Sequence, residues 1–219
     1  MKLEIYNRLR DRILHVEYEP GSILNEQALA EEFNVSRTPM RTVLFKLEWE
    51  HLVKILPRTG IQITELELNR IMNVYQARLE LEDVIGKMAA RRFTAEHFKK
   101  LESLAGQCHD LMDKKDPRAL SGIDMGIKAL FHDAAANPYL TETSDRLYAL
   151  TFRLWYFNML KMDTNEWNQE IIAVKQELAD LSSILAGKDP ADVGQARRQH
   201  LMAHLERIRT KFFSLTDSL

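Results

Sequence analysis

The chain has 219 residues, of which 45% are hydrophobic and 28% are charged, a balance typical of a folded protein with one large domain or two smaller ones. Its formal net charge of −2 excludes a uniformly basic nucleic-acid coat protein, so any basic surface must be local. With 8 glycines and 6 prolines, a turn-rich all-β fold is also excluded. The single cysteine, Cys108, cannot form an intrachain disulfide, so we expect a small core residue and a cytoplasmic protein. The most apolar stretch, residues 148–160, is too short to cross a bilayer, and we predict no membrane partner.

The first 64 residues predict three short helices followed by a hairpin. Apolar residues recur at helical spacing from Ile5 to Val16, and Pro20 with Gly21 ends that helix. The other expected elements are a helix from the N-cap Asn25 to about residue 33, a helix over 37–49 capped by Ser36, and two β-like runs, residues 52–56 and 60–64. This is the order of elements in a winged helix-turn-helix, which we place at residues 1–64.

The rest of the chain, residues 65–219, predicts an all-α bundle of about six helices. No strand signal and no flexible glycine- or serine-rich linker appear, so motion in one domain can reach the other. The expected helices cover residues 66–92, 94 to about 114, 117–137, a segment ending near 162, 165–186 and 189 to about 213. On the first of them the expected apolar side is Ile71, Val74, Tyr75, Leu81, Val84, Ile85 and Met88. The predicted fold class is therefore mostly α.

The helix over 37–49 has the features of a recognition helix, whose N-terminal residues reach base edges in the major groove. Pro39 lies in its first turn, where the amides have no partner within the helix, so the proline helps to start it. Arg37 and Arg41 are one turn apart and share a face. Arginine can bind guanine through O6 and N7. We therefore expect Ser36, Arg37, Thr38 and Arg41 to face DNA.

Charge is distributed to match this expectation. Residues 33–60 hold five basic and two acidic side chains, whereas residues 16–32 hold five glutamates and no lysine or arginine. At the hairpin tip, Arg58 could enter a minor groove, and Gly60 would let the backbone come close to a phosphate. A solvated charged face is the alternative, and the residues alone leave it open.

The N-terminal segment also resembles a known family. The run PGSILNEQALAEEFNVSRTPMRTVLFKLEWEHLVKILPRTGIQIT resembles the DNA-binding domain of GntR-type bacterial transcription regulators nearly residue for residue in its LAEEF-x-VSRTP-x-R and L-x-x-L-E elements. The resemblance implies operator contacts from Arg37, Thr38, Arg41 and the wing around Gly60, with Gln27 touching the DNA backbone. One departure is His51, where the family usually has a helix-ending glycine. We expect His51 to adopt the left-handed cap at modest cost.

The second half resembles, more loosely, the FadR-type (FCD) ligand-binding domain. The matching segments are QARLELEDVIGKMAARR, ALFHDAAANPYL and QHLMAHLERI. The resemblance implies a pocket in the bundle core for a small effector. Arg78, Lys128, His132 and His204 would make it positive, which suits a small carboxylate, and Glu177 would complete the effector-binding set. Trp155, Tyr156 and Phe157 could line the pocket or belong to the ordinary core.

Many members of this branch hold a divalent metal, and here the implied ligand set is altered. Lys128 stands where the family has aspartate, and Glu177 stands where it has a histidine, while Asp124 lies roughly 12 Å from His132 along the helix axis. We expect no metal and an ion pair between Lys128 and Glu177 in its place. Alternatively, Lys128 receives the effector carboxylate, or Zn²⁺ or Ni²⁺ binds at His132, Glu177, His200 and His204.

The sequence thus predicts a homodimeric regulator that binds a pseudo-palindromic operator on double-stranded DNA and responds to a small organic acid. From the tendency of the family that it resembles, we expect a repressor and not an activator. The helix over 66–92 would pass the signal to the DNA-binding domain. Two alternatives remain: a constitutive DNA binder that has lost its effector, and a metal-dependent enzyme with a DNA-binding domain. No nucleophile–base signature supports catalysis, so we expect no enzyme.

Overall fold

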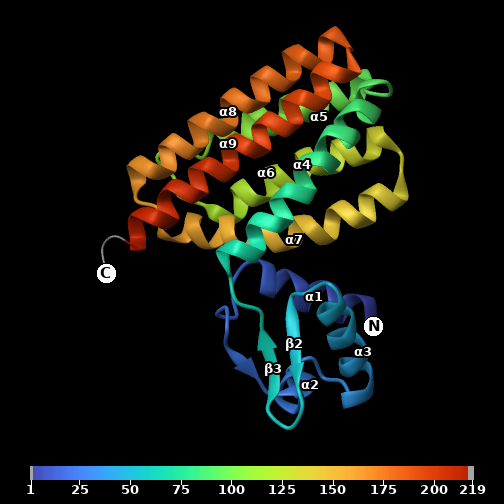
Figure 1. The fold of residues 1–219 in the computed structure, drawn as a ribbon, viewed down its shortest axis with the longest axis vertical. Helices are drawn as coiled ribbons and strands as arrows, with labels where there is room; N and C mark the ends of the chain where they lie inside the picture. Colours follow the sequence, from blue (N-terminus) through green and yellow to red (C-terminus); the bar gives the residue numbers. More distant parts are fainter. Residues whose placement is uncertain (1, 217–219) are drawn as a thin grey trace. The chain divides into compact units, whose positions relative to one another are not determined.

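The computed structural model describes residues 2–216, without the side chains of residues 68 and 211–216. Over these residues it is built from helices and one small sheet, as predicted (Figure 1). The chain folds into two compact units. The winged-helix unit consists of residues 1–72 and 148–157, and the bundle unit consists of residues 73–147 and 158–219. No helix in the described part is both long and apolar enough to cross a membrane.

The winged-helix unit contains the predicted helix-turn-helix and hairpin. Its helices are α1 (Lys2–Leu14), α2 (Glu26–Glu32) and α3 (Arg37–Trp49), and its strands are β1 (Ile23–Leu24), β2 (Val53–Leu56) and β3 (Gly60–Ile63). The strands form one antiparallel sheet in the order β1-β3-β2, with Ile23 opposite Gln62 and Val53 opposite Ile63. The two-residue strand β1 was not predicted, because two residues are too few to show the alternation that marks a strand.

The core of the winged-helix unit is built from the apolar positions that the helical spacing predicts. Ile5, Leu9 and Ile13 of α1 are buried, and the inner side of α3 consists of Met40, Val43, Leu44 and Leu47. Helix α1 ends two residues earlier than expected, since Val16 has a φ of 55° and lies in a turn.

The helix caps agree in position with the sequence, although one lacks the expected bond. The Asn25 side chain accepts hydrogen bonds from the backbone amides of Gln27 and Ala28, so it caps α2 as predicted. Ser36 occupies the N-cap of α3 with extended backbone, but its side chain makes no capping bond. The first turn of α3 therefore has an exposed serine hydroxyl.

The bundle unit contains most of α4 (Leu68–Ala90), together with α5 (Ala95–His109), α6 (Pro117–Ala135), the ends of α7 (Pro138–Lys161), α8 (Thr164–Gly187) and α9 (Pro190–Thr216). Thr94 caps α5 and Pro117 opens α6, as expected. Helix α5 stops about a turn before the predicted residue 114, where backbone bonds of the i to i−3 type replace the helical ones. Cys108 is fully buried and behaves as a core residue.

The buried face of α4 agrees with the predicted one at Ile71, Tyr75 and Ile85 but also includes charged residues. It follows Tyr75, Arg78, Glu82, Ile85 and Ala89, which recur at intervals of three and four. The expected member Val84 is 41% exposed. The spacing of apolar residues alone did not show that Glu82 is buried on this face, because a glutamate at helical spacing is more often solvated.

Candidate functional site

The outer face of α3 displays the residues expected to contact DNA. Ser36, Arg37 and Thr38 are exposed at its N-terminal end, and the side chain of Arg41 is 61% exposed. Their neighbour Met40 is fully buried and anchors the helix. The helix therefore presents one polar edge while its apolar side fixes its position.

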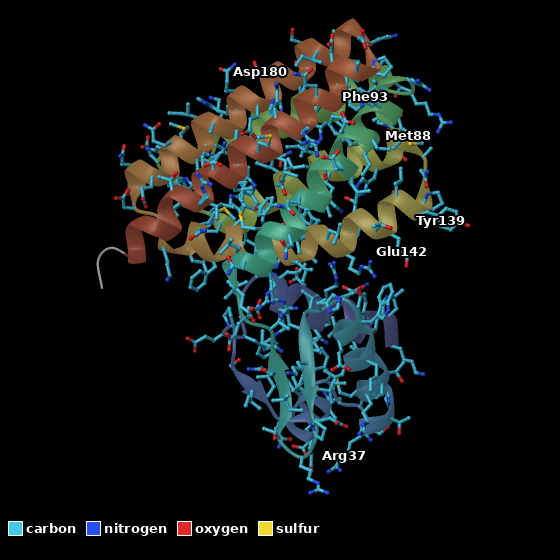
Figure 2. All side chains as sticks on the ribbon, viewed as in Figure 1. Arg37, Met88, Phe93, Tyr139, Glu142 and Asp180 are labelled. Atoms are coloured by element: carbon cyan, nitrogen blue, oxygen red, sulfur yellow. The ribbon has the colours of Figure 1, made fainter. Side chains whose placement is uncertain are left out.

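Helix α2 holds both arginines of this edge. The Arg37 guanidinium donates to the side-chain carbonyl of Gln27, and Arg37 is seen at the surface of the winged-helix unit in Figure 2. The Arg41 Nε lies 3.4 Å from the carboxylate of Glu26. Both acceptors are themselves on a short helix at the surface, so a phosphate or a guanine edge can replace them.

The wing presents Arg58 in the turn between β2 and β3, exposed and with a φ of 65°. Gly60 has a φ of 140°, and a Cβ there would lie 2.6 Å from the carbonyl oxygen of Leu24. The close approach of β1 therefore explains the glycine without DNA. The expected contacts of Gly60 and Arg58 with DNA stay predictions.

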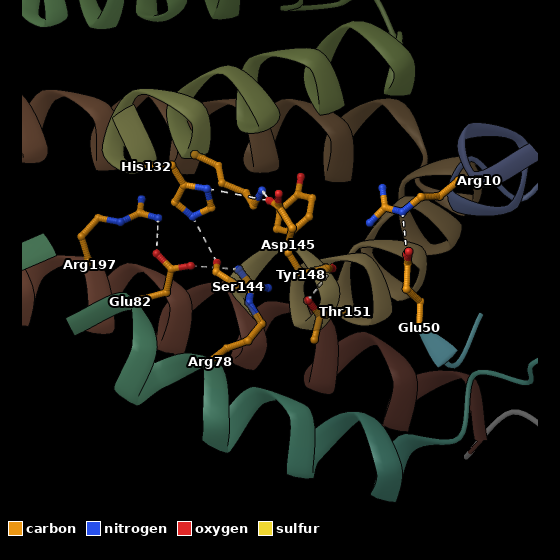
Figure 3. A network of polar contacts seen from close by, with 11 residues as sticks. Arg10, Glu50, Arg78, Glu82, His132, Ser144, Asp145, Tyr148, Thr151 and Arg197 are labelled. Carbon is orange, nitrogen blue, oxygen red and sulfur yellow. Dashed lines mark hydrogen bonds and ion pairs between the residues drawn. The ribbon is translucent and has the colours of Figure 1, made fainter. Parts of the chain in front are cut away.

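A second group of polar residues is buried in the bundle unit, and its centre is Glu82 on α4. Glu82 is 2% exposed and accepts from Arg197 of α9 at 2.6 Å, and it lies 3.5 Å from the guanidinium of Arg78 (Figure 3). Burial raises the pKa of Glu82, but Arg197 and Arg78 outweigh this effect and lower it to about 2. Glu82 is therefore an anion that neutralises the predicted effector residue Arg78.

Lys128 has a different partner from the one expected. Its ammonium group bonds to Asp145 of α7. The same carboxylate lies 3.8 Å from Nδ1 of His132, whose Nε2 is 3.2 Å from the hydroxyl of Ser144 (Figure 3). Burial first, and then Lys128, lower the pKa of His132 to about 4, so His132 is neutral near pH 7.

The predicted Lys128–Glu177 ion pair is wrong. Glu177 accepts from Arg207 of α9 at 2.8 Å, and Arg207 also bonds to the buried Glu170 at 3.0 Å. His204 lies on α9 one turn before Arg207, and burial lowers its pKa to about 3. The expectation failed because it paired two changed positions directly, whereas each has its own nearer partner.

The expected positive pocket is also not present as such. Arg78 and Lys128 each face a carboxylate, and His132 and His204 carry no charge near neutral pH. Charges in this cluster are thus compensated within the chain. We call this cluster the polar core of the bundle unit. Its members are Arg78, Glu82, Lys128, His132, Ser144, Asp145, Glu170, Glu177, Arg197, His204 and Arg207.

Several buried atoms have no hydrogen-bond partner among the described residues. In the bundle unit they include Oη of Tyr75, Nδ2 of Asn158, Nε of Arg197 and Nδ1 of His200. Tyr75 is fully buried, and its pKa is raised by burial. The amide nitrogen of Asn158 and Nε of Arg197 can only donate a hydrogen bond, and the hydroxyl of Tyr75 can donate one. The imidazole nitrogen of His200 donates in one tautomer. Unpaired buried donors favour a ligand that is rich in acceptor oxygens.

The residues at the altered metal position do not suit a cation. The carboxylate of Asp145 lies beside His132, but the ammonium of Lys128 bonds to the same carboxylate and would repel a metal there. Within the part of the chain that the structure describes, no three histidine, cysteine, aspartate or glutamate side chains form a group that could hold a metal ion. Burial first, with a smaller contribution from Asp124, raises the pKa of Glu177 and of Tyr75.

Sequence reasoning missed part of the polar core, namely Glu82, Asp145, Glu170, Arg197 and Arg207. A signal was present in the spacing, since Arg197, His200, His204 and Arg207 repeat every three or four residues along α9. The same spacing marks a solvated helix face. Only the packing of α9 against other helices distinguishes the two.

The family models match both units of the chain. Residues 1–63 match the model described as bacterial regulatory proteins of the gntR family, and residues 73–203 match the FCD domain. Among curated relatives, the HTH-type transcriptional repressor RspR of Escherichia coli K12 is 27% identical over 206 residues, covering 94% of this chain and 88% of that protein. The HTH-type transcriptional regulator McbR of the same strain is 21% identical over 148 residues, covering 68% of this chain and 67% of that protein.

Solved structures share the fold. The structure of E. coli McbR/YncC matches with a TM-score of 0.82 at 18% identity, covering 96% of this chain and 98% of that one. A GntR transcriptional regulator from Rhodococcus sp. RHA1 matches with a TM-score of 0.70 at 16% identity, covering 94% of this chain and 97% of that one. At these identities the comparison bears on the fold alone.

Proposed function

We propose that this member of the GntR family of bacterial regulatory proteins, which carries an FCD domain, is a cytoplasmic, homodimeric repressor. Its family makes it a DNA-binding transcriptional regulator. It binds a pseudo-palindromic operator through α3 and the wing, and it releases that operator when a small carboxylate binds in the polar core. The repressor named RspR, similar over most of this chain, supports repression.

The observation that carries the effector class is the set of buried donors without a partner in the described part of the bundle unit, Tyr75 and Asn158 among them. A carboxylate supplies several acceptor lone pairs in a small volume. It can bond to these donors without a positive pocket, since the fixed charges of the polar core already compensate one another. We propose that Arg78, Lys128, His132, Glu177 and His204 surround the bound effector and fix its orientation.

The DNA part is tested by selecting duplexes from a random-sequence pool with the full-length protein, followed by footprinting. We expect enrichment of a short pseudo-palindrome. Arg41→Ala should then lose roughly 1–3 kcal/mol of discrimination between the selected and a random duplex, with the dimer intact by sedimentation. Equal losses on both duplexes would reduce Arg41 to a phosphate contact, and no enriched sequence would contradict an operator.

The effector part is tested by a thermal-shift screen of mono-, di- and tricarboxylates. We expect at least one to raise the melting temperature and to weaken operator binding measured by fluorescence anisotropy. Tyr75→Phe removes the buried hydroxyl and should reduce the shift. Tyr139→Phe is the matched control, since Tyr139 is 82% exposed. An increase in melting temperature that is the same in Tyr75→Phe as in the wild type would show that the Tyr75 hydroxyl does not donate to the bound carboxylate.

A constitutive DNA binder is the second candidate. It is favoured by the internal pairing of Arg78 with Glu82, of Lys128 with Asp145 and of Arg207 with Glu170, because these three cations are already neutralised before any ligand arrives. Unchanged operator affinity across the whole panel would establish it.

We also propose that Lys128 and Asp145 take the place of a metal. Elemental analysis of protein purified without chelator tests this directly, and one equivalent of tightly held Zn²⁺ or Ni²⁺ would contradict it.

A further inference from the structure

Arg153 of α7 is a buried cation without a carboxylate. It is 1% exposed, and no aspartate or glutamate within the described residues forms an ion pair with it. Its Nε has no hydrogen-bond partner there either, and burial lowers its pKa to about 10. Burying an arginine without a counter-charge is costly, so a stabilising role alone is a poor explanation for this residue.

The guanidinium of Arg153 is directed at one residue of the winged-helix unit. Its two Nη atoms donate to the Oγ1 of Thr64 at 2.7 Å and to the backbone carbonyl of Thr64 at 2.8 Å. Thr64 follows β3, the strand that ends the wing. This bidentate contact fixes both the side chain and the backbone at that point.

Thr64 in turn is bonded to the two residues that follow the C-cap of the recognition helix. Its hydroxyl lies 2.9 Å from the carbonyl of His51 and 3.1 Å from the carbonyl of Leu52, and its amide donates to Leu52 at 3.1 Å. His51 is the left-handed residue that follows the end of α3. Arg153 is therefore two hydrogen bonds from the segment that directly follows the helix proposed to read DNA.

The same turns of α7 also contact α1. The ring of His15 meets Phe152 edge-on at 5.5 Å and Tyr156 at 4.8 Å between centroids. His15 is held by the carbonyl of Asp11 at 2.9 Å. These aromatic residues belong to the winged-helix unit, and whether Tyr156 lines an effector site stays a prediction.

The preceding turns of α7 lie in the polar core of the bundle unit, where Ser144 and Asp145 bond to His132 and Lys128. Asp145 and Arg153 are eight residues apart on one uninterrupted helix, about 12 Å along its axis. A rigid helix with specific bonds at both positions can carry a displacement from one to the other.

We propose that α7 couples the polar core to the winged-helix unit and that Arg153 is the positioning residue which transfers a shift of α7 to the end of α3. This inference rests on the proposed effector control. It adds α7 to the helix over 66–92, whose role as a transmitter stays a prediction, because bonds from α7 reach the segment that follows α3.

Coupling is reciprocal, so operator binding must alter the polar core. The test uses full-length protein and a duplex selected from random-sequence DNA, and it needs no effector. Amide hydrogen exchange is measured in peptides covering residues 128–147 with and without the duplex. We expect exchange rates in the wild type to change roughly fivefold or more, and Arg153→Met to bind the duplex while losing that change.

Two further variants separate positioning from folding. Thr64→Val removes the hydroxyl but keeps the shape, and should also lose the response. Arg153→Lys keeps the positive charge and a donor group on one nitrogen, and should retain part of the response. Arg91→Met, at an exposed arginine, is the matched control. If Arg153→Met does not fold, the exchange response of Thr64→Val is the measurement that tests the role of the Arg153–Thr64 contact.

The outcomes distinguish this inference from the proposed function. A wild-type response that persists in Arg153→Met and Thr64→Val would overturn the role of Arg153 and leave effector control standing. The absence of a response in the wild type would overturn both, while a carboxylate found by thermal shift would still establish ligand binding.

Discussion

His51 follows the recognition helix α3 with a φ of 61°, in the left-handed region that disfavours residues with a Cβ. Its carbonyl is tied to the hydroxyl of Thr64, and the ring itself is exposed. The predicted left-handed cap is therefore confirmed, and its conformation is imposed by neighbours and not by the imidazole.

Replacing this histidine by glycine should stabilise the protein. His51→Gly removes the Cβ that opposes a positive φ, and we expect a gain of roughly 1 kcal/mol in the free energy of unfolding. Urea denaturation followed by circular dichroism measures this free energy. His109→Gly serves as the comparison, because His109 is an exposed residue in the last turn of α5, where glycine should destabilise the helix. A loss of stability in His51→Gly would show that the ring makes a contact which outweighs the backbone strain.

His132 makes the stability of the bundle unit depend on pH. Its folded-state pKa of about 4 is below the value of about 6.5 in an unfolded chain, so only the unfolded state takes up a proton between these values. Its contribution is fully present above pH 6.5 and is lost as the pH falls toward 4, at up to about 1.4 kcal/mol per pH unit.

Urea denaturation between about pH 7 and about pH 5 tests this dependence. His132→Gln should have a shallower decline in the free energy of unfolding than the wild type, although it is less stable at neutral pH. His109→Gln, at an exposed position, should keep the wild-type slope. Identical slopes in all three proteins would exclude a contribution of His132 to the pH dependence.

At the scale of elements, the polar core depends on how closely α4 and α9 approach. A Cβ on Gly86 would lie 3.0 Å from the Cα of Gly194, and a Cβ on Gly194 would lie 2.6 Å from a carboxylate oxygen of Asp83 and 2.7 Å from its carbonyl. This crossing brings Glu82 and Arg197 together, since each lies within four residues of a glycine. Two glycines thus position a charged pair that neither helix could hold alone.

Adding a methyl group at this crossing should separate the two helices. Gly194→Ala is expected to cost roughly 1–3 kcal/mol, because the contacted atoms belong to backbone as well as side chain. Gly122→Ala is the matched control, since a Cβ there meets nothing within 4 Å and should add about 0.5–1 kcal/mol through helix propensity. Thermal unfolding of the two variants measures the difference. Equal stabilities would mean that α4 and α9 can move apart without loss.

At the scale of the whole molecule, the chain is acidic overall, with a net charge of −2 and a pI of about 6.4, yet it binds an anionic polymer. We therefore expect the basic residues of α3 and the wing to supply the attraction, against the repulsion of the remaining surface. The logarithm of the operator affinity should accordingly fall linearly with the logarithm of the salt concentration.

Arg58→Gln should reduce the steepness of this salt dependence by roughly one unit of slope per protomer and weaken all duplexes alike, if Arg58 binds a phosphate. Lys99→Gln removes an exposed charge on α5 and serves as the control. A loss confined to the selected duplex would instead identify Arg58 as a residue that reads sequence or groove width.

The sequence by itself determined the elements and the family. Apolar spacing located α1 and α3, and the caps Asn25 and Thr94 located α2 and α5, because these signals depend on residues within one or two turns of each other. The motif from Arg37 to Arg41 predicted the exposed edge of the recognition helix for the same reason.

Only the tertiary structure decided which charged residues are inside. Arg78, Glu82 and Glu170 lie at helical positions that fit a solvated face equally well, and their burial follows from the approach of α4, α8 and α9. The partners of Lys128 and Arg153, Asp145 and Thr64, are likewise far away in sequence. Local spacing cannot specify a contact between distant segments, since that contact depends on how whole helices pack.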